Sequence, residues 1–353
     1  MLDKLCCSSA FYYHRLPPQV KALCPRFPDV SSLSGKRELL ARAKGFFPLP
    51  LPLHVLAVNH PYGLQGKSIQ THIWNGPLPQ EAFWHDEDLD VTYASPLFTL
   101  LTLAPCISLY QLAMVAFELC GTFSVYKPSD DIQKELDRIC DQRLTWAGEW
   151  RQVKDYKNKP TSLWRRDPLI ELDDLRRFVQ ETKGMRGNVD LARAIEMVTG
   201  VTASPLEVQA SLLLGLSRSM GGEGLGPFVN NQRIPLSEQA RKLAGQSTCF
   251  ADVFFEANDR HRDIDVELQG HMIHDGGIAG GLDANRSLGL QAMGIEVVHL
   301  TSEQLSNAER FRETASYLAK KLGIMRKPKS PKMLEREQKL RRSLFINWET
   351  LGA

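Results

Sequence analysis

Between residues 204 and 322 the spacing of apolar positions changes repeatedly from helical to strand-like. Apolar residues recur every three or four positions in some segments and alternate with polar residues in others, which separates helices from strands. The pattern predicts helices over 204–216, 237–243, 283–293 and 302–322, and strands over 228–236, 250–256, 262–269 and 295–300. Without the short helix over 237–243, the predicted order is α-β-β-β-α-β, an α/β arrangement.

The two central strands predict a β-hairpin, because they flank the turn-forming residues Asn258 and Asp259. If the turn is centred between residues 259 and 260, Asp252 lies opposite Glu267, since paired positions in a hairpin have a constant sum. Residues in that relation point to the same face, with Cβ atoms about 4.5–5.5 Å apart. Gln269 lies on the same face, because side chains alternate along a strand.

Two carboxylates and an amide therefore converge on one face of the predicted hairpin. Like charges this close repel each other unless a cation, a shared proton or open solvent offsets them. Mg²⁺ takes oxygen ligands of this kind, usually one or two carboxylates with water and substrate phosphate. A soluble edge with scattered acids is the simpler alternative. Phe250, Phe254 and Leu268 argue against it, because they predict partial burial, where an unused carboxylate is uncommon.

The N-terminal half predicts a small sheet followed by a pair of helices. Its strands are expected over 53–60 and 68–74, as a hairpin with a long loop, and over 88–93. Ser95 and Pro96 predict the start of one helix, and Gly121 the end of a second that begins at Ser108. Charged helices are expected over 130–149, 170–183 and 189–198.

These elements divide the chain into four parts, and its 353 residues are enough for two separate cores. We predict an α+β domain over 1–150, a charged helical connector over 151–200, an α/β domain over 201–325 and a basic C-terminal tail over 326–353.

The net charge of +2, from 43 basic and 41 acidic residues, excludes a globally basic nucleic-acid binder. Residues 326–342 carry a local excess of basic residues, which makes Lys332, Arg336 and Lys339 candidate contacts to a DNA backbone. The alternative for this segment is a solvated tail that leads to residues 344–348, which dock on the body. Arg165 and Arg166 form a smaller cluster that is typical of a solvated helix face, with DNA contact as the alternative.

The seven cysteines include no Cys-x-x-Cys pair, and no apolar run is long enough for a membrane span or a secretory signal. A reduced cytoplasmic location without membrane contact is therefore expected. Cys6 and Cys7 are adjacent, and His54, His60 and His72 fall on neighbouring predicted strands. We expect buried or surface cysteines and hydrogen-bonded or solvent-facing histidines, because adjacent cysteines rarely chelate alone and no carboxylate stands among the histidines. A metal site is the alternative for both groups.

Short motifs follow one another in a recognisable order between residues 200 and 323. They are Ser204-Pro-Leu-Glu207 at a helix start, Asp252 on one strand, Glu267-Leu-Gln269 on the next, and Asp283-Ala-Asn-Arg286 followed by Leu290 and Gly294. This order resembles the PD-(D/E)XK restriction-like nucleases, and in particular domains related to very-short-patch-repair endonucleases. Gln269 stands where Lys is usual, and Ala251 where Pro is usual. The N-terminal region is weakly similar to abortive-infection antitoxin-like proteins.

The resemblance implies a restriction-like core and a Mg²⁺- or Mn²⁺-dependent endonuclease that acts on DNA, in phage defence or DNA repair. Asp252 and Glu267 would hold the metal, Gln269 would position the attacking water, and Glu207 would assist. Arg286 would contact a phosphate or an acidic ligand. His271 and His274 would assist proton transfer or be structural.

Two alternatives to an active enzyme stay open. One is a nuclease-like fold that has lost catalysis and binds DNA as a regulator in a defence or toxin-antitoxin system, and the Gln269 substitution favours it. The other is a protein-protein scaffold. The sequence also leaves open whether the chain forms a homodimer.

Overall fold

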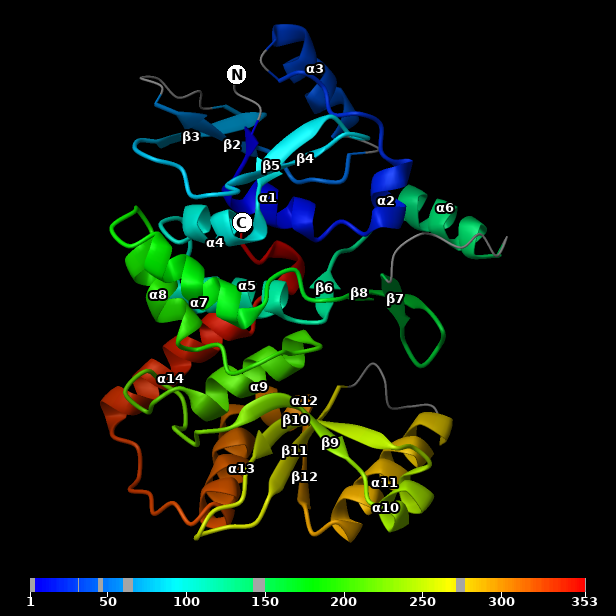
Figure 1. The fold of residues 1–353 in the computed structure, drawn as a ribbon, viewed down its shortest axis with the longest axis vertical. Helices are drawn as coiled ribbons and strands as arrows, with labels where there is room; N and C mark the ends of the chain where they lie inside the picture. Colours follow the sequence, from blue (N-terminus) through cyan, green and yellow to red (C-terminus); the bar gives the residue numbers. More distant parts are fainter. Residues whose placement is uncertain are drawn as a thin grey trace.

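Three β-sheets, separated and flanked by helices, follow one another along the long axis of the molecule (Figure 1). The structure is a computed structural model, and it describes residues 4–30, 32–43, 47–59, 66–141, 150–270 and 277–352. The chain is therefore a mixed α/β protein, as the hydrophobic pattern predicts. In those ranges no helix is both long and apolar enough to cross a membrane.

The N-terminal sheet has the strand order β3-β2-β1-β5-β4. Its strands are β1 (Lys4–Leu5), β2 (Leu53–Val58), β3 (Ile69–Trp74), β4 (Phe83–Asp86) and β5 (Val91–Ala94). The predicted hairpin of β2 and β3 is wrong, because these strands are parallel, with Leu56 opposite His72.

The helices that follow begin and end where their capping residues predict. Ser95 caps α4 (Pro96–Leu103), and Ser108 forms a capping box with Gln111 at the start of α5 (Leu109–Cys120). Gly121 ends α5, and a Cβ atom there would lie 2.6 Å from the carbonyl oxygen of Thr202. Only glycine therefore lets these two segments approach so closely. Before β2 the chain forms α1 (Cys7–His14), α2 (Pro18–Leu23) and α3 (Leu33–Arg42).

A second sheet crosses the boundary that we predict at residue 150. It is formed by β6 (Phe123–Val125), β8 (Pro160–Arg165) and β7 (Arg151–Lys154), in that order. The predicted connector is therefore partly β-structure. The hydrophobic pattern did not indicate these strands, because charged and polar residues hide the apolar alternation in an exposed hairpin. The helices of this region are α6 (Asp130–Asp141), α7 (Leu172–Glu181) and α8 (Asn188–Ile195).

The C-terminal half follows the predicted order of elements. It consists of α9 (Pro205–Gly215), β9 (Val229–Pro235), α10 (Glu238–Ala244), β10 (Thr248–Phe255), β11 (Ile264–Gln269), α11 (Gly277–Ala292), β12 (Glu296–Thr301), α12 (Ser302–Ser306) and α13 (Ala308–Lys321). The strand order is β12-β11-β10-β9, antiparallel except for the parallel pair of β11 and β12. The helix predicted over 302–322 is divided at Asn307, whose side chain caps α13.

The two faces of this sheet differ in character. Val253, Phe255 and Val266 belong to the main core, together with residues of α13. Cys249 and Ala251 of β10 belong to a smaller core formed with residues of α10 and α11, and Phe254 packs against it. Figure 1 shows α13 along one flank of the sheet and α10 and α11 along the other. Asp252 and Phe254 point to the other side of β10, because side chains alternate along a strand.

The segment predicted as a basic tail is packed onto the body of the protein. It forms α14 (Pro331–Leu344) and a short 3-10 helix, η1 (Trp348–Thr350). Lys329 is paired with the buried Glu223 and Glu337, both at 2.8 Å, and Arg326 also pairs with Glu223. Gly221 contacts α14 so closely that a Cβ atom would lie 2.5 Å from the carbonyl oxygen of Arg336. The Gly-rich turn at 221–226 is therefore a packing site.

A buried ion pair connects the C-terminus to the N-terminal half. Arg15 and Glu118 are 2% and 0% exposed, and the guanidinium donates two hydrogen bonds to the carboxylate, of 2.6 and 2.8 Å. A third donor of Arg15 bonds the carbonyl oxygen of Trp348 at 2.9 Å. The pair thus joins α1, α5 and η1 in one network.

Glu118→Gln is expected to lower the free energy of unfolding by about 3–5 kcal/mol, because it leaves the Arg15 charge buried without its partner. Glu135→Gln is the matched control, since Glu135 pairs with Arg138 on the exposed face of α6. An exposed pair of this kind contributes less than about 1 kcal/mol. Urea unfolding of the two variants measures the difference. Equal losses would contradict the role of the buried pair.

Candidate active site

A cavity of about 460 Å³ lies between the C-terminal sheet and the middle of the molecule. Its walls come from β8, α9, the ends of β10 to β12, α11 and residues 347–349. The four residues predicted to be catalytic, Glu207, Asp252, Glu267 and Gln269, all line it, and so does Arg286. The structure therefore brings together five residues that span 80 positions of the sequence.

The hairpin has the predicted register. Val253 lies opposite Val266, and the same constant sum places Asp252 opposite Glu267. Beyond Val253, the carboxylate of Asp252 accepts a hydrogen bond of 2.8 Å from the backbone N–H of Leu268. The Asp252 carboxylate thus bonds a backbone N–H of the neighbouring strand at this point of the hairpin. Both carboxyl groups face the cavity.

The acidic groups raise one another's affinity for protons. Burial raises the pKa of Asp252 well above its ordinary range, and the nearby Glu207 and Glu267 raise it further. Burial also raises the pKa of Glu207, although hydrogen bonds to its carboxylate oppose the shift. These bonds come from the N–H of Ala203 (2.6 Å) and the hydroxyl of Ser204 (2.8 Å). Together these carboxyl groups form a site that favours the binding of a cation or a proton.

Hydrogen bonds behind the acids fix α9 against β9 and β10. The hydroxyl of Ser211 donates to the carbonyl oxygen of Glu207 (2.7 Å) and accepts from the side-chain amide of Asn230 (2.7 Å). The same amide donates to the carbonyl oxygen of Asp252 at 2.9 Å. Asn230 is 3% exposed, so the chain positions Glu207 relative to Asp252 through buried groups.

Arg286 supplies a positive charge at the centre of the site. Its guanidinium donates to Glu267 at 2.7 Å and also to the carbonyl oxygen of Phe250. Burial lowers the pKa of Arg286, but the charges of Glu267 and Asp252 raise it overall. The Nε–H is buried without a hydrogen-bond partner in the part of the chain that the structure describes. The guanidinium as a whole lines the cavity.

Gln269 occupies the end of β11 beside the acids. Its amide nitrogen donates to Nδ1 of His299 at 3.1 Å, and His299 on β12 is the register partner of Glu267. His299 also lines the cavity and was missed from the sequence. The parallel pairing of β11 with β12 brings it here, and no local pattern specifies which residue of a distant strand lies opposite Glu267.

Asp265 is a further acid of the same face that was not predicted as a site residue. It is 0% exposed, and within the described ranges neither of its carboxyl oxygens has a hydrogen-bond partner. Burial raises its pKa well above the ordinary range, and so does the carboxyl of Glu267, which lies close to it without forming a well-directed hydrogen bond. The alternation of Asp265, Glu267 and Gln269 along one strand was the signal that could have identified it.

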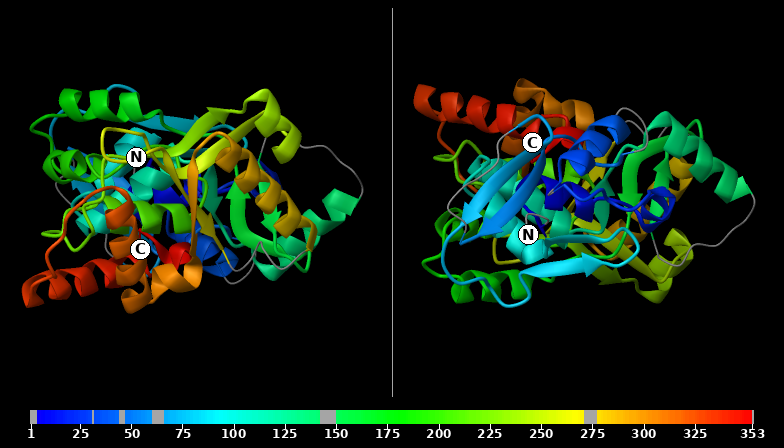
Figure 2. Two further views of the ribbon diagram at one scale, coloured as in Figure 1. Left: turned by 90° about the horizontal axis from the view of Figure 1, so that it is seen from below. Right: turned by 90° about the horizontal axis from the view of Figure 1, so that it is seen from above.

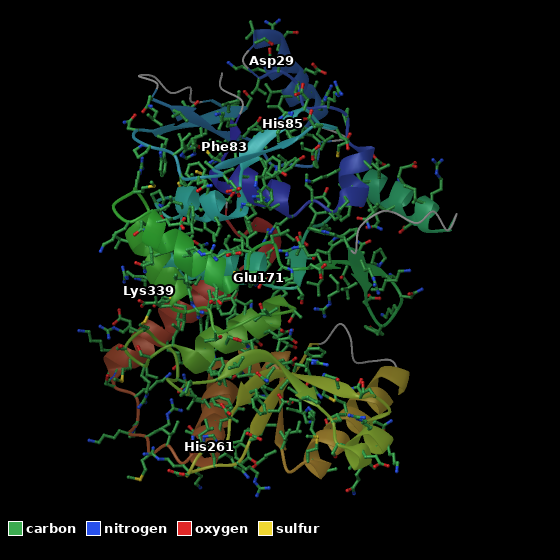
Figure 3. The ribbon with its side chains drawn as sticks, viewed as in Figure 1. Asp29, Phe83, His85, Glu171, His261 and Lys339 are labelled. Atoms are coloured by element: carbon green, nitrogen blue, oxygen red, sulfur yellow. The ribbon has the colours of Figure 1, made fainter. Side chains whose placement is uncertain are left out.

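The predicted DNA contacts do not form one surface. Arg286 lies in the cavity, whereas Lys332, Arg336 and Lys339 are exposed on α14. Figures 1 and 2 show α14 and α11 on opposite sides of the molecule, and Figure 3 labels Lys339 beside α14. Arg165 is a closer basic residue, since it lines the cavity from β8. His271 and His274 lie outside the described residues.

Asp265→Asn is expected to stabilise the metal-free protein, and more at pH 8 than at pH 5. Since the folded-state pKa of Asp265 is raised, folded wild type keeps a proton that the unfolded chain releases above about pH 4. Wild-type stability therefore falls as pH rises through this window, and the amide removes that loss. Thermal unfolding with chelator should show a midpoint gain that is at least about 2 °C larger at pH 8.

Glu256→Gln is the control for this comparison, because Glu256 is an exposed acid near the turn of the same hairpin. It should leave the pH dependence of the unfolding midpoint unchanged. A gain for Asp265→Asn that is equal at both pH values, or larger at pH 5, would contradict the account.

Known proteins do not identify this site. The chain matches no protein-family model, no curated protein and no solved structure. The interpretation of the site therefore rests on its own geometry and chemistry.

Proposed function

We propose that this protein is a divalent-metal-dependent endonuclease that hydrolyses phosphodiester bonds in DNA. The observation that carries the proposal is the convergence of Asp252, Glu267 and Glu207 on one cavity, with the unpartnered carboxyl of Asp265 directly behind. Such a group of buried acids is costly unless it binds something positive. We propose that the enzyme acts in phage defence or DNA repair.

The residues present fit a hard divalent cation. Mg²⁺ and Mn²⁺ prefer carboxylate and amide oxygens, which Asp252, Glu267 and Gln269 present to the cavity. Asp252 and Glu267 would hold the ion, while Glu207 and Asp265 would add negative charge around it. When bound, the ion would activate water for attack and neutralise charge on the phosphate.

The protein's own groups would orient the substrate. Arg286 lines the cavity, and its guanidinium would donate to a phosphate oxygen. This supplies the positive charge that Gln269, as a neutral amide, lacks. With its nitrogen bonded to His299, Gln269 keeps its carbonyl oxygen free to accept a hydrogen bond from the attacking water. Arg165, from the opposite wall, would hold a second phosphate.

The arrangement of elements supports a restriction-like core over residues 204–322. One helix, three antiparallel strands, a helix and a parallel strand follow in order, and the acids lie where the middle strands separate. The weak resemblance of the N-terminal region to antitoxin-like proteins gives no further role.

One observation favours a second candidate, a regulatory DNA-binding module without catalysis. The guanidinium of Arg286 already neutralises Glu267 at 2.7 Å, which is how a site that has lost its metal would be stabilised. Gln269 in the position of the usual Lys agrees with this. The two candidates differ in one property: only the enzyme requires Mg²⁺ or Mn²⁺.

Asp252→Asn and Glu267→Gln are each expected to reduce metal-dependent DNA cleavage by at least about 100-fold, since losing a metal ligand removes several kcal/mol of transition-state stabilisation. Cleavage of plasmid and single-stranded DNA, with Mg²⁺, Mn²⁺ or chelator, measures this. Glu256→Gln should cleave like wild type, because Glu256 is exposed and away from the acidic cluster.

Cleavage that persists in both variants would contradict the proposed site. If wild type binds DNA in a salt-sensitive manner with chelator present and cleaves nothing, the regulatory module replaces the enzyme. If it neither binds nor cleaves DNA, a protein-protein scaffold is the remaining interpretation.

A further inference from the structure

Three thiols and an imidazole gather at the base of the N-terminal sheet, away from the acidic cavity. Cys6 and Cys7 stand at the junction of β1 and α1, His72 is on β3, and Cys106 follows the end of α4. Three separate segments, spread over a hundred residues, therefore place sulfur and nitrogen atoms together. None of these residues takes part in the proposed DNA cleavage.

Cys6, Cys7 and His72 lie close enough together to share one ion, and Cys106 adjoins this group through Cys7. Cys6, Cys7 and His72 each have one possible ligand atom that lies within 4.8 Å of those of the other two. The sulfurs of Cys7 and Cys106 are 3.9 Å apart. With zinc-sulfur bonds of about 2.3 Å, two thiolates on a tetrahedral zinc ion are about 3.8 Å apart. The observed sulfur separation is also far longer than the roughly 2.05 Å of a disulfide.

Ordinary contacts account for only part of this group, since the thiol of Cys7 donates to the carbonyl oxygen of Thr102 at 3.2 Å. Cys6 and Cys7 are 0% and 1% exposed and could be small apolar side chains, but apolar packing gives no reason for an imidazole beside them. Cys7 also has a φ of +48°, a left-handed conformation that a cysteine rarely adopts. That conformation occurs at the residue whose sulfur lies nearest Cys106.

A second histidine orients the first. Nε2 of His72 lies 2.9 Å from Nδ1 of His54, and the carbonyl oxygen of His54 accepts the backbone N–H of Cys6 at 2.9 Å. Metal-bound histidines usually donate their second ring N–H to an acceptor, which fixes the ring and its tautomer, and Nδ1 of a neutral His54 can accept it. His54 thus fits the role of an outer partner that connects His72 to Cys6.

We propose that Cys6, Cys7, Cys106 and His72 bind one zinc ion as a structural centre of the N-terminal domain. Three thiolates and an imidazole select Zn²⁺ over the hard Mg²⁺ that suits the acidic cavity, so the two sites would hold different metals. Four protein ligands leave no open position for catalysis. The ion would tie the end of α4 and strand β3 to the start of α1.

Metal analysis of the full-length protein, purified without chelator, tests the site. About one equivalent of zinc per chain is expected. Replacing the zinc with Co²⁺ should produce the intense visible bands of a tetrahedral ion and a thiolate-to-cobalt charge-transfer band in the near ultraviolet. Because removing an outer partner alone typically costs 10–100-fold in metal affinity, Cys106→Ser and His72→Asn should each weaken zinc binding by at least about 100-fold.

Cys24→Ser is the matched control and should bind zinc like wild type, since Cys24 lies outside the cluster. Cys106 is exposed, so its substitution should leave the fold intact, which circular dichroism checks. The proposal fails if wild type holds no zinc after incubation with ZnCl₂ and desalting, or if both ligand variants retain it fully. A Cys7–Cys106 disulfide in the wild type as purified, without bound zinc, would also overturn it. DNA cleavage, present or absent, does not bear on this result.

Discussion

Mutual repulsion among buried carboxyl groups is the constraint on which the C-terminal half depends. Asp252, Asp265 and Glu267 share one face of the β10–β11 pair, and Glu207 approaches from α9. Burial and this mutual repulsion raise the pKa of Asp252 and of Asp265 well above the ordinary range. The surrounding structure reduces this repulsion with directed groups, because Leu268 N–H bonds Asp252 and Arg286 bonds Glu267. The repulsion that these groups do not offset favours the binding of a cation.

The cavity also depends on contacts between distant parts of the chain. Its walls include β8 and residues 347–349, which lie far in sequence from the strands that carry the acids. The end of the chain is held there because the carbonyl oxygen of Trp348 accepts a hydrogen bond from Arg15, which Glu118 neutralises. The N-terminal half therefore helps to enclose the site, even though the predicted catalytic residues all come from the C-terminal half. This gives the N-terminal half a structural function that does not require a separate activity.

The features that could be predicted from sequence depend on local chemistry. Ser95, Ser108 and Ser204 each cap the helix that follows, and the turn at Asn258 and Asp259 sets the register that pairs Asp252 with Glu267. The missed features depend on pairings between distant segments. No spacing within the sequence indicates that β2 and β3 are parallel or that His299 lies opposite Glu267. The grouping of Cys6, Cys7, His72 and Cys106 was missed for the same reason, because each residue alone is typical of a core or a surface. The burial of Lys329 between Glu223 and Glu337 likewise depends on the docking of α14.

Whether the acidic cluster binds a divalent cation is tested most directly by titrating the protein with Mn²⁺ and following the free ion by electron paramagnetic resonance. Wild type should deplete the free Mn²⁺ signal with about one equivalent bound at the cluster, and excess Mg²⁺ should restore it. Asp252→Asn and Glu267→Gln should each weaken this binding by at least about tenfold, whereas Glu256→Gln should not. Identical titration curves for wild type and the two cluster variants would contradict the account, because the carboxyl groups would then be balanced by Arg286 and protons alone.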